Sequence, residues 1–345
     1  MMHRPLDASR HFGAILKKSE LISSYNGGML SEAPLVSVVT PTFNAGRFLR
    51  ESIESVLTQD YPNIEYLVVD SYSTDETRDI LREHCGRLRM IQADRLGPAA
   101  AIHTGLSQAR GSILAWLNAD DRYDPGAIRS AAAFFQRHPK ADVVYGDAWW
   151  IDQNSEAIRP YPTIPFDPGV LKRDCFISQP ATFFRADVYK KYPLDPSLPV
   201  SFDYDLWIRM AKDNRCFQHL PERLANSRMH RDCLTLARRR EVFEVTIALL
   251  KKHYGYVPLP WVFGYLSYKR DGRDQFFEPL RDSATVFAAS LPFGMELNRN
   301  EALRFLGDWI WTAGHGLQKQ VSRLRTLLTE PERPKATQAA AGRRI

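Results

Sequence analysis

The sequence predicts an α/β fold with a mostly parallel, doubly wound sheet and a helical C-terminal extension. Between residues 34 and 147, short β-branched runs alternate with amphipathic helical segments, and the connections are short. Polar residues follow the ends of three of these strands, at 41–44, 70–75 and 118–121. Because ligands of open α/β sheets bind outside the carboxyl ends of the strands, we expect these three segments to face one crevice.

The alternation begins with a strand, a helix and a second strand. Residues 35–39 form a β-branched run that predicts a buried strand. The next apolar residues recur at helical spacing and share one helix face: Leu49, Ile53, Val56 and Leu57. Turn residues at 60–63 end that helix, and residues 65–69 predict a second strand that leads into Asp70.

The pattern then repeats. Ser73-Thr74-Asp75-Glu76 has the form of a capping box and predicts a helix through Leu81. We expect the later elements in the order strand 88–92, helix 98–109, strand 113–117, helix 125–136 and strand 142–145. Residues 148–201 are rich in proline and aromatics and less regular, and a helix is expected over 203–213.

The two ends of the chain have a different composition. Residues 1–33 are predicted to be a weakly ordered leader, and residues 331–345 a disordered tail. Residues 238–330 are predicted to be helical, with apolar positions near heptad spacing at Leu303, Leu306, Ile310, Ala313, Leu317, Val321, Leu324 and Leu328. This stripe favours packing against the protein's own core over membrane contact or a homo-oligomer. The run 238–240 is three arginines, which either touch anionic lipid or form a solvated turn.

Composition excludes several classes of protein. A chain of 345 residues with 44% hydrophobic content buries one large core, and its net charge of +6 is only mildly basic. The arginines are dispersed and no zinc-finger or RNA-recognition signature is present, so we expect no nucleic-acid partner. The cysteines are far apart and predict reduced thiols: Cys85, Cys175, Cys216 and Cys233. Without a secretory or membrane-length apolar run, a cytoplasmic location is expected, with room for peripheral contact at the inner face of the membrane.

The acidic segment Asn118-Ala119-Asp120-Asp121 carries the chemistry. The turn after the first strand has no G-x-G-x-x-G, and no Walker A sequence is present, so a bound diphosphate needs another source of positive charge. Two adjacent carboxylates at a strand end repel each other unless they share a cation or water reaches them. Oxygen ligands suit Mg²⁺ or Mn²⁺, which also bridge to substrate phosphates. The alternative is an exposed turn, since Asn and Asp favour turns.

Residues 35–235 resemble the family 2 glycosyltransferases, which have the GT-A (Rossmann-like) fold. The resemblance is carried by 36–44, by Asp70 with 73–75, by 97–105 and by 109–121. On the acceptor side it is carried by the motifs 179–184, 203–209 and 228–230. It implies a GT-A domain over 34–237, with a nucleotide-sugar half at 34–147 and an acceptor half at 148–237.

The resemblance implies an inverting glycosyltransferase that moves a sugar from a nucleotide-diphosphate sugar, with UDP favoured, to an acceptor hydroxyl. The acceptor would be a saccharide or lipid-linked molecule in surface polysaccharide or glycolipid synthesis. Asp203 would be the catalytic base, with Asp205 the competing candidate, and Asp120 and His230 would hold a divalent metal, Mg²⁺ or Mn²⁺. The donor would meet Pro41, Thr42, Asn44, Asp70, Ser73, Arg95, Asn118 and Asp121. Acceptor-side residues would be Gln179, Pro180, Asp205 and Trp207.

Four positions depart from the family pattern: Asn118, Tyr72, His103 and Phe202. Asn118 removes a charge from the acidic loop, which lowers the expected metal affinity. Apolar Phe202 beside Asp203 is expected to raise the pKa of that carboxyl. Two rival functions stay open, a non-catalytic sugar-nucleotide-binding scaffold and a nucleotidyltransferase. The second normally needs a glycine- and lysine-rich triphosphate loop, which is missing near Pro41.

Overall fold

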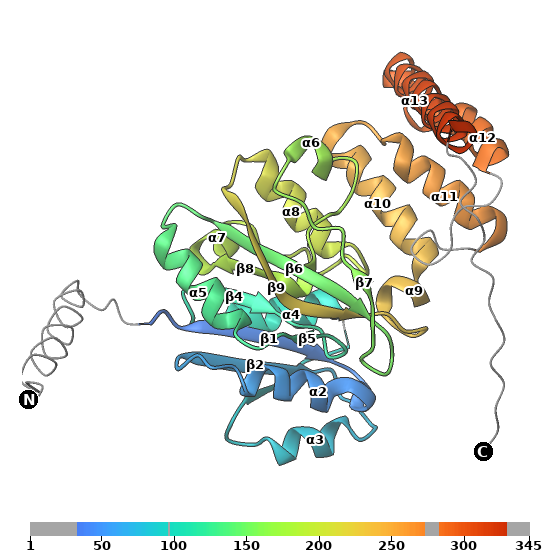
Figure 1. Cartoon of the computed structure of the whole chain (residues 1–345). Coiled ribbons are helices and arrows are strands. Elements are labelled where there is room, and N and C mark those ends of the chain that lie inside the picture. The colour runs from blue at the N-terminus through green and yellow to red at the C-terminus, as the bar shows by residue number, and fades with distance from the viewer. Residues whose placement is uncertain (1–32, 96, 273–282, 330–345) are drawn as a thin grey trace, which may run out of the picture. The chain divides into compact units, whose positions relative to one another are not determined.

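The computed structural model describes residues 33–95, 97–272 and 283–329 (Figure 1). These form two compact units, one containing the described residues up to Leu171 together with Cys175–Val242, the other Lys172–Asp174 and the described residues from Phe243 onward. The predicted leader, apart from Ala33, and the predicted tail lie outside the described residues.

The first unit is built on one sheet of nine strands in the order β3-β2-β1-β4-β8-β6-β9-β5, with β7 added beside β6. The four N-terminal strands pair in parallel, as predicted, whereas β8 runs antiparallel to both β4 and β6. The strands are β1 (Val36–Thr42), β2 (Ile64–Asp70), β3 (Arg89–Gln92), β4 (Ile113–Trp116), β5 (Arg122–Tyr123), β6 (Val143–Ile151), β7 (Ala157–Pro160), β8 (Thr182–Arg185) and β9 (Phe217–Arg228).

Helices lie on both faces of this sheet (Figure 1). Val36 and Val38 share one buried cluster with Leu49 and Ile53 of α2. On the other face α4 approaches β1 so closely that a Cβ on Gly105 would lie 2.4 Å from a methyl of Val39. The helices of this unit are α2 (Gly46–Leu57), α3 (Thr77–Glu83), α4 (Pro98–Gln108), α5 (Ala127–Arg137), α6 (Pro168–Leu171), α7 (Ala186–Lys191), α8 (Phe202–Lys212) and α9 (Leu234–Ala237), with the 3-10 turn η1 (Gln179–Ala181).

The predicted capping box at 73–76 does not form. The helix α3 starts only at Thr77, and the side chain of its N-cap residue, Glu76, makes no capping hydrogen bond. Asp75 instead accepts hydrogen bonds from the backbone N–H groups of Thr77 and Gly46, at 3.1 Å each. The Ser73 hydroxyl is engaged by Asp70 and Asn44. Tertiary partners thus replace the local capping pattern.

The three arginines at 238–240 do not form a free cationic patch. Arg239 is buried, and Arg238 forms an ion pair with Glu241 one turn along the chain. The helix α10 (Arg239–Tyr254) begins within this run. The run is therefore not a fully solvated turn, because Arg239 is buried, and contact of the exposed Arg238 and Arg240 with anionic lipid stays a prediction.

The second unit is helical, as predicted. Its core gathers Tyr256, Val257, Val262 and Phe305. Buried Asn298 ties the unit together, because its amide accepts a bond from the Val257 N–H at 2.7 Å and donates to the carbonyls of Val257 and Gly294. The elements are α11 (Leu259–Asp271), α12 (Ser283–Leu297), the 3-10 turn η2 (Arg299–Glu301) and α13 (Ala302–Thr329).

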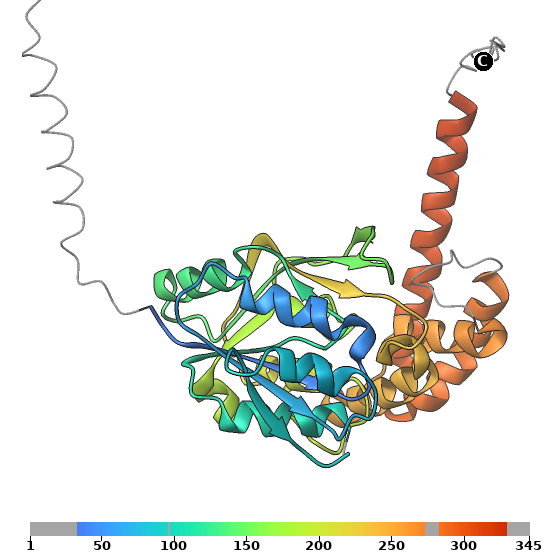
Figure 2. The ribbon, with the colours of Figure 1, turned by 90° about the horizontal axis from the view of Figure 1, so that it is seen from below.

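Helix α13 is one continuous helix in Figure 2, and among its described side chains the predicted apolar stripe is buried only in part, at Leu306 and Ala313. Leu303 is 82% exposed and Ile310 57%, whereas Phe305 is fully buried. At 3.6 residues per turn, Phe305 lies roughly 200° around the helix from Leu303, so a second face meets the core. Leu317, Val321, Leu324 and Leu328 lie beyond the described side chains. No helix in the described ranges combines the length and hydropathy of a membrane span.

Candidate functional site

The ends of β1 and β2 meet in register, with Thr42 opposite Asp70. The Thr42 side chain is 4% exposed, and its hydroxyl has no hydrogen-bond partner among the described residues. A buried hydroxyl without a partner costs roughly 1–3 kcal/mol, a cost that a ligand at this edge would remove. Pro41, immediately before it, is partly buried.

Asp70 organises the loop that follows β2. Its carboxylate is 1% exposed and accepts bonds from the Ser73 hydroxyl at 2.5 Å and the Gln92 amide at 2.9 Å. Asn44 has a left-handed backbone, with φ 49°, and its side-chain oxygen accepts the Thr74 N–H at 2.8 Å. Three predicted site residues, Asn44, Asp70 and Ser73, therefore form one hydrogen-bonded edge of the site.

An exposed aromatic residue that the sequence argument did not single out stands beside this loop. Phe43 is 48% exposed, and the guanidinium of Arg95 lies 4.6 Å from its ring centre. Arg95 is fixed there because it donates to the carbonyls of Ser71, at 3.2 Å, and Tyr72, at 2.8 Å. The signal in the sequence was a large aromatic in a strand-end turn, where an exposed ring indicates a binding surface.

The acidic loop follows β4 and is held from three sides. The Asn118 amide donates to Asp121 Oδ2 and to Gln179 Oε1, both at 3.1 Å, and the Ser52 hydroxyl of α2 donates to the Asn118 carbonyl at 3.2 Å. Gln179 is 8% exposed and also donates to the Trp116 carbonyl. The amide of Gln179 therefore bonds to the acidic loop, and the following Pro180 is buried as well.

The two carboxylates of the loop have different surroundings. Asp121 is 4% exposed and receives the Arg228 N–H at 2.8 Å besides the Asn118 amide. Burial, and then the charge of Asp120, raise the pKa of Asp121 well above its usual range. Asp120 is more exposed, and its Oδ2 lies 3.1 Å from Nε2 of His230. Asp120 is thus the carboxylate that a ligand can reach.

Asp120 Oδ2 and His230 Nε2 are hydrogen-bonded to each other, 3.1 Å apart. A carboxylate oxygen and an imidazole nitrogen side by side are suited to hold a divalent metal. No cluster of three or more His, Cys, Asp or Glu suited to a metal occurs in the described ranges. A Mg²⁺ or Mn²⁺ ion held by two protein ligands would complete its shell with substrate phosphate oxygens and water.

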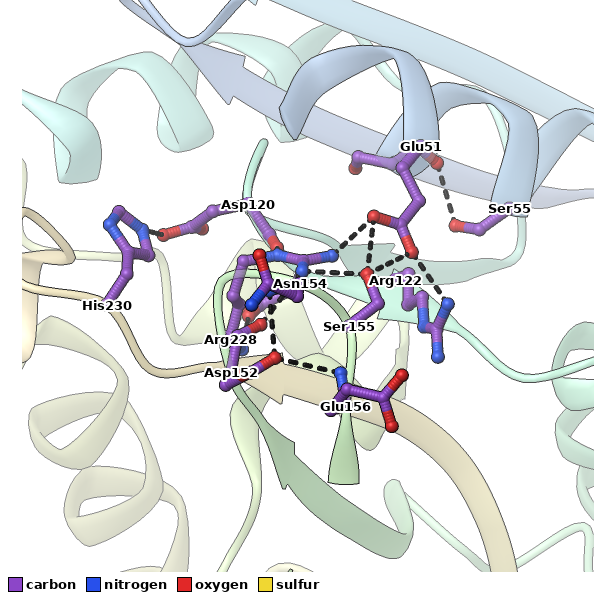
Figure 3. A network of polar contacts seen from close by, with 12 residues as sticks. Glu51, Ser55, Asp120, Arg122, Asp152, Asn154, Ser155, Glu156, Arg228 and His230 are labelled. Carbon is purple, nitrogen blue, oxygen red and sulfur yellow. Dashed lines mark hydrogen bonds and ion pairs between the residues drawn. The ribbon is translucent and has the colours of Figure 1, made fainter. Parts of the chain in front are cut away.

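Arg228, at the end of β9, connects the acidic loop, the β6–β7 turn and helix α2 (Figure 3). Its guanidinium is 1% exposed and donates to the carbonyl of Asp120, to the carbonyl of Asp152 and to Glu51 Oε2 at 2.6 Å. Sequence reasoning placed Arg228 in a motif but gave it no role, and it did not consider Glu51 at all.

Helix α8 carries the two candidate bases. Asp203 is half-buried, its side chain accepts the Tyr204 N–H at 2.8 Å, and burial raises its pKa, in the direction predicted from apolar Phe202. Asp205 is 2% exposed and paired with Arg209 at 2.7 Å. Arg209 neutralises Asp205, whereas no arginine among the described residues pairs with Asp203.

Trp207 is not an acceptor-side contact. It is fully buried and stacks on Trp116, with ring centres 5.8 Å apart. Because Trp116 directly precedes the acidic loop, this stack attaches the helix of Asp203 to the strand that carries Asp120. A side chain with no exposed surface cannot touch an acceptor, so the prediction for Trp207 was wrong.

Residues 37–192 match the family described as Glycosyl transferase family 2. The matched segment, just under half of the chain, is similar to a family 2 glycosyltransferase domain. An uncharacterized glycosyltransferase of Rickettsia prowazekii is 31% identical over 212 residues, which cover 57% of this chain and just under two thirds, 65%, of the relative. An O-antigen biosynthesis protein of Myxococcus xanthus is 29% identical over 205 residues, 58% of this chain and 16% of that protein.

The fold of this domain also matches solved structures. The crystal structure of Staphylococcus aureus TarS 1–349 in complex with UDP-GlcNAc superposes with a TM-score of 0.57 at 17% identity, over 79% of this chain and 83% of TarS 1–349. The α/β fold class predicted from the sequence is therefore confirmed.

Proposed function

We propose that this chain is an inverting glycosyltransferase that moves a sugar from a nucleotide-diphosphate sugar to an acceptor hydroxyl. The observation that carries the proposal is the pair Asp120 and His230, 3.1 Å apart at the strand-end edge. The adjacent carboxylate and imidazole would be suited to hold one divalent ion, which would counter the charge of a bound diphosphate. The same edge contains the unpartnered hydroxyl of Thr42.

In this proposal Asp120 and His230 would hold Mg²⁺ or Mn²⁺ at the donor diphosphate. When bound, the ion supplies Lewis-acid stabilisation of the departing diphosphate. Asp121, which is locked by Asn118 and the Arg228 N–H, keeps the acidic loop in a fixed shape. Preorganised groups of this kind do not have to reorient during the reaction.

Asp203 accepts the proton of the attacking hydroxyl. Its raised pKa brings the carboxyl nearer to neutral pH, where a general base is most effective. Direct displacement with a single base inverts the anomeric carbon and needs no covalent intermediate, unlike the two-carboxylate retaining glycosidases. Asp205 is unsuited to this role because Arg209 neutralises it.

The nucleotide base is assigned to the exposed ring of Phe43, beside Asp70 and Arg95. Stacking on an aromatic ring contributes about 1–3 kcal/mol per base. UDP-sugars are the first donors to test, and the TarS complex with UDP-GlcNAc supports that order. A nucleotidyltransferase is disfavoured because the β1–α2 turn contains no lysine-rich triphosphate loop.

The acceptor is proposed to be a saccharide or lipid-linked molecule of a surface polysaccharide, which the Myxococcus relative's name supports.

The exposed face of α13 would rest on an anionic lipid surface. It presents Leu303, Ile310 and Trp311 at more than half exposure, next to exposed Arg304, while Asp308 is bonded to Tyr256. Basic amphipathic helices of this kind bind anionic membranes. Co-sedimentation with anionic but not neutral vesicles tests this contact, and self-association without vesicle binding would favour an oligomer instead.

A donor screen tests the enzyme proposal. UDP-, GDP- and dTDP-sugars are incubated with Mn²⁺, and the release of nucleoside diphosphate is followed. We expect release from at least one donor, with loss in Asp120→Ala but not in Asp79→Ala, a matched change at an exposed residue of α3. Metal-dependent UDP binding without turnover on any donor or acceptor would favour the scaffold function.

A further inference from the structure

We propose that Arg228 is a positioning residue that sets the spacing of Asp120 and His230, with Glu51 as its counter-charge. The inference rests on the proposed function, since it assigns to Asp120 and His230 the role of metal ligands. Arg228 itself touches neither donor nor metal in this proposal.

Arg228 acts on both members of the pair. Its Nε donates to the carbonyl of Asp120 at 2.8 Å, and its own N–H donates to Asp121 Oδ1 at 2.8 Å, so the acidic loop is held at two points. His230 follows two residues later along the same backbone. One residue thus connects the backbone of the first ligand with the backbone of the second.

The guanidinium is itself fixed by segments that are distant in the sequence. Nη1 donates to the Asp152 carbonyl at 3.0 Å and to the Ser155 hydroxyl at 2.9 Å, both in the β6–β7 turn. Nη2 bonds Glu51 of α2 at 2.6 Å, and the guanidinium carbon lies 4.7 Å from the ring centre of Phe48. Phe48 also packs on the His230 ring, with centres 4.7 Å apart. The arginine therefore has little freedom to move.

Glu51 and Ser155 close the network. Ser155 accepts from Arg228 and donates to both oxygens of Glu51, at 2.8 and 2.9 Å. Burial alone would raise the pKa of Glu51, but the Ser155 hydrogen bond and the charges of Arg228 and Arg122 lower it overall. Glu51 is therefore ionised at neutral pH and balances the buried charge of Arg228, which would otherwise be strongly destabilising.

Lysine cannot replace this arginine. The planar guanidinium directs donors from Nε, Nη1 and Nη2 along fixed directions toward three different segments, whereas an ammonium is a compact point charge on a flexible stem. Arg228→Lys keeps the charge near Glu51 but removes the fork that holds the Asp120 carbonyl. Arg122→Lys is the matched control, because Arg122 pairs with the other oxygen of Glu51, at 2.6 Å, through an ion pair that does not include Asp120.

The test uses the full chain and a readout that does not require turnover. Mn²⁺ is titrated by calorimetry in the presence of UDP into wild type, Asp120→Ala, Arg228→Lys and Arg122→Lys, and a thermal melt is recorded for each. We expect Arg228→Lys to weaken Mn²⁺ binding about 10–100-fold, the range seen when groups that orient metal ligands are lost. Arg122→Lys should stay within about twofold of wild type. Donor hydrolysis by Arg228→Lys should recover at high Mn²⁺, which a purely structural defect would not allow.

Each outcome decides the inference. Unchanged Mn²⁺ affinity in a folded Arg228→Lys variant, with binding lost in Asp120→Ala, overturns the role of Arg228 and leaves the proposed function standing. Absence of Mn²⁺ binding by wild type overturns both. If Arg228→Lys does not fold, Glu51→Gln replaces it, because the amide oxygen still accepts from Nη2 while the counter-charge is lost. We then expect a weakening of about tenfold, the lower end of the same range, and wild-type affinity in Glu51→Gln would overturn the inference.

Discussion

Exchanging the two aspartates of α8 for asparagine separates catalysis from stability. Asp203→Asn removes the proposed base, and loss of a general base lowers turnover about 10²–10⁴-fold. Asp205→Asn keeps a side-chain oxygen for Arg209 but removes the charge from a bond of 2.7 Å. Hydrogen bonds to charged groups contribute about 1 kcal/mol more than neutral ones, so we expect Asp205→Asn to destabilise the fold by about 1–2 kcal/mol.

The stability of Asp203→Asn should change in the opposite direction. Because the folded-state pKa of Asp203 is raised, folding favours its protonated form, and wild-type stability falls as pH rises from the unfolded pKa through the folded one. Asparagine carries no such cost at neutral pH, so its melting temperature should equal or exceed that of wild type. Asp205→Asn should melt about 2–8 °C lower than wild type.

The assays are turnover, followed by release of nucleoside diphosphate, and thermal melting by circular dichroism. Wild-type turnover should fall as pH drops below the raised pKa of Asp203, since only the ionised form accepts a proton. The reasoning is refuted if Asp205→Asn loses turnover 100-fold while Asp203→Asn retains it, because the base would then be the arginine-paired carboxylate.

Three further changes test other parts of the structure. Asn298→Ala removes three buried hydrogen bonds and should lower the free energy of unfolding by about 3 kcal/mol in a urea titration of the full chain; a loss below about 1 kcal/mol would contradict the bonding described. Phe43→Ala should raise the donor KM about tenfold with kcat nearly unchanged, which initial rates over a donor series measure, and an unaltered KM would exclude stacking on this ring. Ser155 has a left-handed φ of 67°, which glycine adopts more easily than alanine. Ser155→Gly and Ser155→Ala both lose the hydroxyl, but the glycine variant should be more stable by about 1 kcal/mol and should melt at a higher temperature. Equal melting temperatures would mean that the backbone at Ser155 is not strained.

The elements that sequence predicted well are those fixed by local pattern. The β-branched run at 35–39 and the helical spacing of Leu49 and Ile53 are enough to define β1 and α2, and parallel pairing then brings Thr42 and Asp70 together. The candidate residues at strand ends follow from this geometry without any knowledge of side-chain contacts.

The sequence-based predictions failed where contacts with residues distant in the sequence determine the role of a side chain. Ser73 does not cap the helix because its hydroxyl already donates to the Asp70 carboxylate and accepts from the Asn44 N–H. Trp207 is buried by its stack on Trp116, a partner that helical spacing does not reveal. The Arg228 network was invisible for the same reason, since Glu51 and Arg228 are 177 positions apart. On α13 the periodicity identified an apolar stripe, but not which side of the helix meets the core.

The bond between Asn118 and Gln179 predicts that these two positions vary together among relatives. An aspartate at 118 would place a third carboxylate beside Asp121, and the Gln179 oxygen, now paired with the Asn118 amide, would lose its donor and face a negative charge. The Gln179 amide could not turn to compensate without releasing the Trp116 carbonyl. Relatives that carry aspartate at 118 should therefore carry, at 179, a side chain other than glutamine that donates a hydrogen bond to it. Introducing aspartate at 118 alone in this chain should weaken the hydrogen bonding that holds the acidic loop.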